Sequence, residues 1–202
     1  MFHVKHSRLL VATHNAGKLA EMRQLLPGLE VVGAAELGLP EPEETADSFV
    51  GNARIKAWAA CHATGLPALA DDSGLEVDAL GGAPGVRTAD WAATDGGRDF
   101  LVAMRRTHDA LVAAQAPEPW EARFVCVLFL ARPDGTEDFW EGRAEGRLVW
   151  PPRGPFGHGY DPVFVPEGHD ATFAEMGEDA KNRLSHRGKA ARAFAADVLG
   201  AR

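Results

Sequence analysis

Residues 123–147 read RFVCVLFLARPDGTEDFWEGRAEGR, and they decide the architecture that the sequence predicts. We expect two long strands, over residues 123–131 and 136–147. Pro133, Asp134 and Gly135 lie between these strands, and such a combination is a strong signal for a hairpin turn. The predicted sheet therefore contains one long hairpin.

Shorter segments complete the predicted fold. The expected strands are short apolar runs at residues 9–13, 31–32 and 67–70. The expected helices cover residues 18–26, a stretch from an N-cap at Asp47 or Ser48 to residue 60, residues 96–106, and a C-terminal stripe of Ala190, Phe194 and Val198. The segments at residues 81–85 and 151–162 are rich in glycine and proline and are expected as loops. Helices interspersed with strands favour an α/β fold with a mixed β-sheet and flanking helices.

The composition is ordinary for a soluble globular protein, with 46% hydrophobic and 25% charged residues. We expect a single domain over residues 1–202, in which residues 1–7 form a flexible tail. The chain has no apolar stretch near the ~20 residues of a membrane span and no signal-peptide pattern, so we expect a cytoplasmic protein. Cys61 and Cys126 lie in apolar surroundings and are expected as buried thiols.

The net charge of -8 argues against a protein that binds nucleic acid, because such a protein needs a basic face. The same charge restricts how a polyanionic ligand could bind. Any phosphate site must be locally positive although the protein is negative overall. A few lysine and arginine side chains and a cation would have to supply this positive charge.

Two adjacent carboxylates, Asp71 and Asp72, follow the apolar strand at residues 67–70. We expect them in a tight turn, where buried acids are costly unless they are paired or bound to a metal. Mg²⁺ prefers carboxylate oxygen and substrate phosphates. The alternative is an Asp-Ser-Gly turn whose side chains cap their own backbone, and these residues alone leave both interpretations open.

Residues 13–18, Thr-His-Asn-Ala-Gly-Lys, lie where a strand is expected to end and a helix to begin. Free backbone N–H groups and the helix dipole favour an anion there. The segment is not a P-loop, because Ala12 stands at the position of the first glycine and Leu19 replaces the serine or threonine. A capped turn with a solvated lysine is the alternative.

Two further segments contain candidate ligand-binding side chains. Glu44 precedes a helix on which Asn52 and Lys56 share a face, and Glu44 could pair with Asp72 as a second metal ligand. In the loop at residues 157–162, an aromatic or imidazole ring could stack on a base. An acidic exposed surface and a plain surface loop are the respective alternatives. The motifs of serine hydrolases, zinc sites and dinucleotide-binding folds are absent.

In order along the chain, these segments resemble the inosine triphosphate pyrophosphatase family, house-cleaning enzymes that hydrolyse noncanonical purine nucleoside triphosphates. The matching blocks are Thr13–Lys18, Glu44–Thr45 with Phe49, Asn52–Ala53 and Lys56–Ala57, Ala70–Leu75, Gly81–Val86, Gly159–Phe164 and Ser185–Gly188. The resemblance extends from about residue 9 to residue 199. It implies an elongated, two-lobed fold with a central cleft, and a homodimer.

The resemblance also implies a role for each matching residue. Asp72 would be the catalytic proton acceptor, and Glu44 and Asp72 would bind Mg²⁺. The substrate-binding residues would be Thr13, His14, Asn15, Ala16, Gly17, Lys18, Lys56, Ser73, Gly157, His158, Gly159, Tyr160, Asp161, Lys181, His186 and Arg187. The chain departs from the family at His158, where a phenylalanine is usual, and at Ala46 and Gly51, where a glycine and a glutamate are usual.

The implied reaction converts a nucleoside triphosphate and water to the monophosphate and pyrophosphate. His186 and Arg187 would donate hydrogen bonds to the 6-keto oxygen of hypoxanthine or xanthine. The 6-amino group of adenine is itself a donor and would form no hydrogen bond with these two side chains. Two alternatives stay open. One is a pyrophosphatase for modified pyrimidine or thymidine nucleotides, and the other is a nucleotide-binding regulator without turnover.

Overall fold

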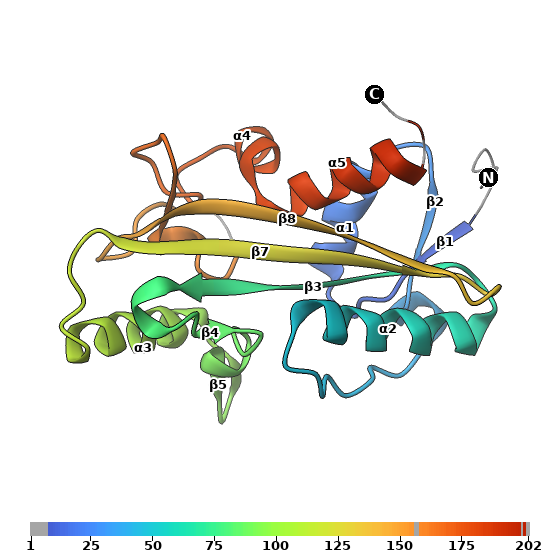
Figure 1. Cartoon of the computed structure of the whole chain (residues 1–202), viewed down its shortest axis with the longest axis horizontal. Coiled ribbons are helices and arrows are strands. Elements are labelled where there is room, and N and C mark those ends of the chain that lie inside the picture. The colour runs from blue at the N-terminus through green and yellow to red at the C-terminus, as the bar shows by residue number, and fades with distance from the viewer. Residues whose placement is uncertain (1–7, 156–157, 199, 201–202) are drawn as a thin grey trace. The chain divides into compact units, whose positions relative to one another are not determined.

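The computed structural model describes residues 8–155, 158–198 and 200 (Figure 1). Its main sheet has seven strands in the order β2-β1-β3-β7-β8-β9, and β4 pairs with β3. Strand β1 is parallel to β2 and β3, whereas β4 and β9 are antiparallel to their partners. The predicted α/β fold with a mixed sheet is therefore confirmed.

The strands of the main sheet are β1 (Arg8–Val11), β2 (Glu30–Gly33), β3 (Ala68–Val77), β4 (Pro84–Gly85), β7 (Trp120–Ala131), β8 (Glu137–Leu148) and β9 (Phe164–Pro166). A separate small hairpin consists of β5 (Ala93–Thr94) and β6 (Gly97–Arg98). The helices are α1 (Ala16–Leu25), α2 (Phe49–Thr64), α3 (Phe100–Ala113), α4 (Glu178–Leu184) and α5 (His186–Val198). None of the described helices combines the length and the apolar character needed to cross a membrane.

The chain folds into two compact units, and the long strands β3, β7 and β8 contribute residues to both. The first unit comprises Met1–Asp72, Cys126–Gly142 and Arg187–Arg202. The second comprises Ser73–Val125 and Arg143–His186.

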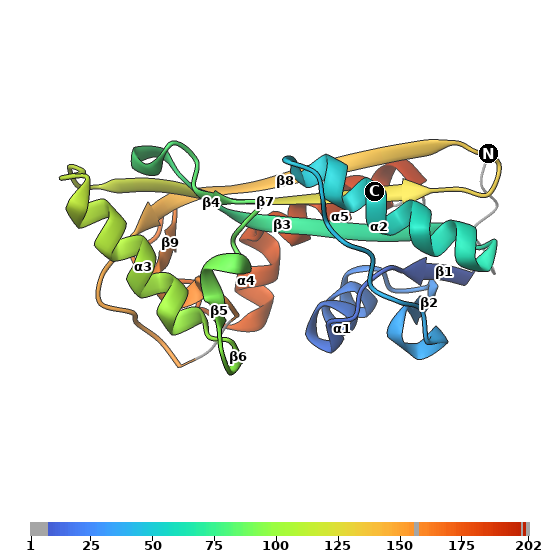
Figure 2. The ribbon, with the colours of Figure 1, turned by 90° about the horizontal axis from the view of Figure 1, so that it is seen from below.

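The core of the first unit lies between strands and two helices. Cys126, Leu128 and Leu130 alternate along β7, so their side chains point to one face of the sheet, where Ala190 and Phe194 of α5 pack on them. In Figures 1 and 2, helix α2 covers the opposite face of these strands. Both cysteines are free and buried, as predicted, and burial raises the pKa of the Cys126 thiol to about 12.

The core of the second unit is rich in aromatic rings. Phe124, Tyr160, Phe164 and Phe173 are buried together with apolar residues of α3. The Asp99 side chain accepts a hydrogen bond from the backbone N–H of Leu101 and so begins this helix. In Figure 2, the β5–β6 hairpin lies close to the N-terminal end of α3.

Most predicted elements are confirmed, including the long hairpin, the helix that Ser48 caps and the C-terminal helix. Three predictions are wrong. Pro84 and Gly85, expected in a loop, form the short strand β4 against β3. Residues 71–75 do not form a tight turn but continue β3, because β1 and β4 pair with this strand and favour the extended backbone. Gly97 lies in β6 with φ 117°, so the helix expected from residue 96 begins only at Phe100.

The close approach of β8 and β9 leaves no space for a side chain at Gly146. A Cβ atom there would lie 2.3 Å from the Val165 carbonyl oxygen and 2.7 Å from the Phe164 ring. We expect Gly146→Ala to lower the free energy of unfolding by about 1–3 kcal/mol in urea denaturation, as overpacking does. Gly96→Ala is the matched control, because the nearest atom to its Cβ is 4.0 Å away. Equal stability of the two variants would contradict the expectation.

Candidate active site

Two neighbouring aspartates of β3 point to opposite faces of the sheet. Successive side chains of a strand alternate between faces, so Asp71 points toward α1 and α5, while Asp72 points toward α2. Both side chains are buried, with 5% and 6% of each residue exposed. Each buried charge therefore requires partners on its own face.

Asp71 is bound by two cations. The Nζ atom of Lys18 lies 2.9 Å from Asp71 Oδ2, and the guanidinium of Arg187 donates to the same oxygen at 3.3 Å. Arg187 also donates to Glu21 Oε2 at 2.6 Å. Burial would raise the pKa of Asp71, but the charges of Lys18 and Arg187 outweigh burial and hold the pKa well below its usual range.

On the opposite face, one lysine joins the two carboxylates predicted as metal ligands. Lys56 Nζ lies 2.8 Å from Glu44 Oε1 and 3.5 Å from Asp72 Oδ1. Glu44 and Asp72 come from separate segments, so the tertiary structure brings them together as expected. Burial raises the pKa of Asp72 to about 6, and the negative charges of Glu44 and Asp71 add to this rise, while Lys56 opposes it.

The turn at residues 13–18 is built by its own side chains. Asn15 is the N-cap of α1 and accepts a hydrogen bond from the Lys18 N–H at 3.1 Å, and Thr13 Oγ1 accepts one from the Asn15 N–H. Ala16 and Gly17 are exposed in the first helical turn, where N–H groups have no partner within the helix. The capped-turn interpretation is thus confirmed for Asn15. However, Lys18 is paired with Asp71 and is not merely solvated.

The charged cluster of the first unit has more carboxylates than cations. Its cations are Lys18, Lys56 and Arg187, and its carboxylates are Glu21, Glu44, Asp71 and Asp72. With all of them ionised, the formal charge is negative, so lysines and arginine alone do not reverse the overall field. A triphosphate needs a further cation to bind here.

The donor set suits a hard cation that prefers oxygen ligands. Among the residues that the structure describes, no group of three or more histidine, cysteine, aspartate or glutamate side chains is placed to hold a metal. Glu44 and Asp72 provide two carboxylates. Mg²⁺ sites in proteins usually contain one or two carboxylates, and water and phosphate oxygen atoms complete the coordination shell.

In the second unit, Asp161 organises the residues predicted to bind the nucleoside. Its Oδ2 accepts hydrogen bonds from the His158 N–H and from Lys181 Nζ, both at 2.6 Å. His158 itself is exposed. Gly157 lies outside the described residues, and so does the predicted tail at residues 1–7. Ser73 lies in β3 and is partly buried.

Tyr160 does not offer its ring to a ligand. The side chain is buried with 1% exposed, its hydroxyl lies 3.1 Å from Thr107 Oγ1, and its ring meets Phe100 edge to face. The ring therefore belongs to the core, and only the backbone of Tyr160 is left for contact with a nucleotide. The exposed ring of this loop is the imidazole of His158.

Sequence reasoning missed Glu21 and Phe124, which contact the predicted site residues Arg187 and His186. Glu21 lies three residues after Lys18 on α1, and this helical spacing was an available signal. Phe124 stacks on the His186 imidazole, with ring centroids 4.8 Å apart and planes at 12°. Nothing in the sequence pattern pointed to that contact.

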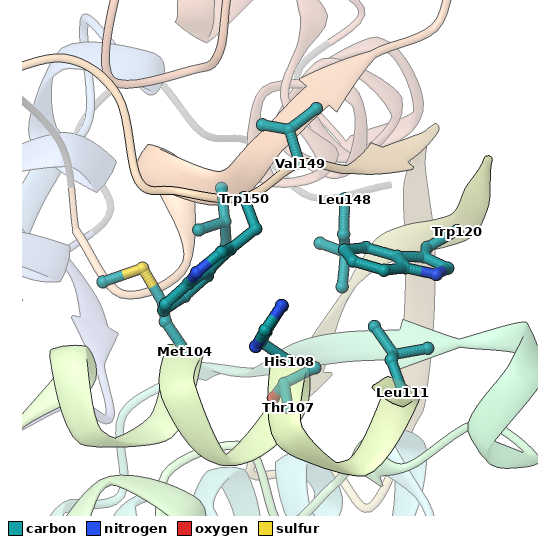
Figure 3. A pocket seen from close by; sticks show the side chains of 9 residues that line it. Met104, Thr107, His108, Leu111, Trp120, Leu148, Val149 and Trp150 are labelled. Atoms are coloured by element: carbon teal, nitrogen blue, oxygen red, sulfur yellow. The ribbon is translucent and has the colours of Figure 1, made fainter. Parts of the chain in front are cut away.

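A hollow elsewhere in the second unit does not suit phosphate (Figure 3). Met104, Thr107, His108 and Leu111 line one side of it, and two tryptophans close it from β7 and the end of β8. The His108 ring stacks on Trp150, with centroids 4.4 Å apart. The lining contains no lysine or arginine, so this hollow lacks the charges that a triphosphate requires.

The two aspartates should affect stability in opposite directions. The pKa of Asp72 is raised in the folded protein, so its ionisation costs stability above about pH 6, and this cost disappears as the pH falls toward 4. At pH 8 with EDTA, we expect Asp72→Asn to raise the free energy of unfolding by about 1–3 kcal/mol. We expect Asp71→Asn to lower it by about 3 kcal/mol or more, because two buried cations lose their partner. Urea denaturation measures the free energy of unfolding of both variants. A change of the same sign in both variants would refute the expectation.

Comparison with known proteins places nearly the whole chain in one family. The model of the Ham1 family matches residues 9–197. A dITP/XTP pyrophosphatase of Ruegeria pomeroyi is 63% identical over 194 residues, which cover 95% of both chains. One of Mesorhizobium japonicum is 55% identical and covers 93% of this chain and 91% of the relative.

Solved structures agree with these sequence relatives. A HAM1 protein from Coxiella burnetii has a TM-score of 0.88 and 38% identity, covering 96% of this chain and all of that one. A nucleoside-triphosphatase / dITP/XTP pyrophosphatase from Mycobacterium abscessus has a TM-score of 0.74 and 41% identity, over 95% and 98% of the two chains. Both the resemblance seen in the sequence and the type of fold are confirmed, and the chain belongs to the Ham1 family.

Proposed function

We propose that this chain is a nucleoside-triphosphate pyrophosphatase that hydrolyses the noncanonical purine nucleotides dITP, ITP and XTP to the monophosphate and pyrophosphate. The main support for this proposal is that Glu44 and Asp72, from separate segments, both form ion pairs with the ammonium group of Lys56. The names of the relatives in the Ham1 family support the same activity.

The metal in this proposal is Mg²⁺, held by Glu44 and Asp72. When bound, it neutralises phosphate oxygens and lowers the pKa of a coordinated water. Lys56, which now forms ion pairs with both carboxylates, is then available to phosphate oxygens. The same holds for Lys18, because Arg187 still neutralises Asp71 after Lys18 has turned to the ligand.

Hydrolysis would proceed by attack of water on the α-phosphorus. Asp72 accepts the proton of this water, a new P–O bond forms, and the bond from the α-phosphorus to the bridging oxygen breaks, which releases pyrophosphate. The backbone N–H groups of Ala16 and Gly17, at the start of α1, bind phosphate oxygens, so this contact requires no charged side chain. Lys18 and Lys56 stabilise the charge that develops on the leaving group.

The nucleoside would be recognised by residues of the second unit. His158 stacks on the base, and Asp161 holds the loop of His158 and the ammonium of Lys181. Two nitrogen atoms of Arg187 already donate to Glu21 and Asp71. We therefore assign the main contact with the 6-keto oxygen to His186. The homodimer and the cytoplasmic location that the resemblance implies also belong to this proposal.

The substrate proposal is tested by pyrophosphate release from ITP, XTP, ATP, dTTP and UTP, each with Mg²⁺ and with EDTA. We expect Mg²⁺-dependent turnover of ITP and XTP that exceeds turnover of ATP by orders of magnitude. Comparable rates with ATP would refute the selectivity, and preference for dTTP or UTP would favour a pyrimidine enzyme. Binding of ITP without any turnover would identify a regulator.

The role of Asp72 is tested by Asp72→Asn, which we expect to lower kcat by about 10²–10⁴-fold, the usual contribution of general base catalysis. Asp170→Asn is the matched control, since the Asp170 side chain is fully exposed on the surface. Full Mg²⁺-dependent turnover by Asp72→Asn would remove Asp72 from the mechanism.

The role of Glu44 as metal ligand is tested by titrating the activity with Mg²⁺. We expect Glu44→Gln to raise the Mg²⁺ concentration for half-maximal rate by about 10–100-fold, in the range seen for groups that support a bound metal. Glu43→Gln, one residue earlier, is the control and should keep the wild-type requirement. An unchanged requirement in Glu44→Gln would show that Glu44 does not hold the metal.

A further inference from the structure

The structure assigns a positioning role to Phe124: its ring sets the plane of the His186 imidazole and thereby the selectivity for the 6-substituent of the purine. This inference rests on the proposed function, because it takes His186 as the donor to the 6-keto oxygen. Phe124 does not contact the nucleotide in this proposal and acts only through His186.

The contact itself is a parallel stack of two buried rings. The centroids of Phe124 and His186 lie 4.8 Å apart with an interplanar angle of 12°. Phe124 is 6% exposed and His186 is 8% exposed. Both residues belong to the second unit, so the stack lies within one compact body.

Phe124 is itself held by two other rings. Phe164 packs on it with centroids 4.7 Å apart, and Phe173 with centroids 6.1 Å apart, while Phe164 and Phe173 contact one another at 5.2 Å. A ring fixed by close packing on several sides keeps a single orientation. The face that Phe124 presents to the imidazole is therefore rigid.

A fixed plane matters for histidine because its ring nitrogens donate and accept in the plane of the ring. Setting this plane sets the direction of the N–H donor. A directed, desolvated donor binds a 6-keto oxygen well and meets a 6-amino group without forming a hydrogen bond. A donor free to tilt would lose part of this discrimination.

The experiment compares ring-removing variants at two positions of the same aromatic core. We expect Phe124→Leu to lower the ratio of kcat/KM for ITP over ATP by about tenfold or more, since small errors of placement are costly in catalysis. Phe173→Leu removes one of the two rings that hold Phe124 and should lower the ratio much less than Phe124→Leu does, because Phe164 still packs on Phe124. Phe124→Tyr keeps the stacked ring and should keep the ratio.

A double-mutant cycle shows whether Phe124 acts through His186. We expect His186→Gln to lower the same ratio, and Phe124→Leu to add nothing in that background. An independent readout is the NMR signal of the His186 ring protons, which the Phe124 ring shifts upfield. Phe124→Leu should remove this shift, and Phe173→Leu should retain it.

Distinct results separate this inference from the proposed function. An enzyme that releases no pyrophosphate from ITP refutes the proposed function and, with it, this role of His186. A selective enzyme in which His186→Gln lowers the ratio but Phe124→Leu does not overturns the role of Phe124. Equal losses in Phe124→Leu and Phe173→Leu would overturn it too, because the effect would then reflect general loosening of the core.

Discussion

Two consecutive carboxylates on one buried strand impose the main physical constraint on this protein. Because β3 is extended, Asp71 and Asp72 face opposite sides of the sheet, and each side must supply its own positive charge. Lys18 and Arg187 supply it on one side, and Lys56 supplies it on the other. Helices α1, α2 and α5 of the first unit each contribute one of these cations.

The two aspartates are in different electrostatic states. Asp71 has two cationic partners and a lowered pKa, so it serves as a permanent anion that fixes Lys18 and Arg187. Asp72 pairs with Lys56, and burial together with the negative charges of two nearby carboxylates raises its pKa. Such a carboxylate is costly in the free protein and gains most from a bound cation. Under the proposed function, binding of Mg²⁺ would offset this cost in folding stability.

In the second unit, packing and hydrogen bonds hold the loop of His158 and the ring of His186 in fixed orientations. Asp161 is buried and holds the loop of His158 through a backbone N–H, while the aromatic core around Phe124 holds His186. Tyr160, the single tyrosine of the chain, contributes its ring to that core. Rigid apolar packing therefore supports the polar groups that we propose for recognition of the base.

Much of this could be predicted from the amino-acid sequence. Local signals are sufficient for the hairpin at Pro133–Gly135, for the caps at Asn15 and Ser48, and for the α/β class, because turn chemistry and apolar periodicity act between neighbouring residues. The residue types of the candidate site could also be named in advance, since carboxylates, lysines and glycines in these blocks resemble one family.

Only the tertiary structure decided which charges meet. Residues 71–75 have the local chemistry of a turn, and pairing with strands β1 and β4 overrides it. The contact of Glu21 with Arg187 and the stack of Phe124 on His186 join residues far apart in the chain. Such contacts arise from packing between elements, and no local pattern contains the information that selects them.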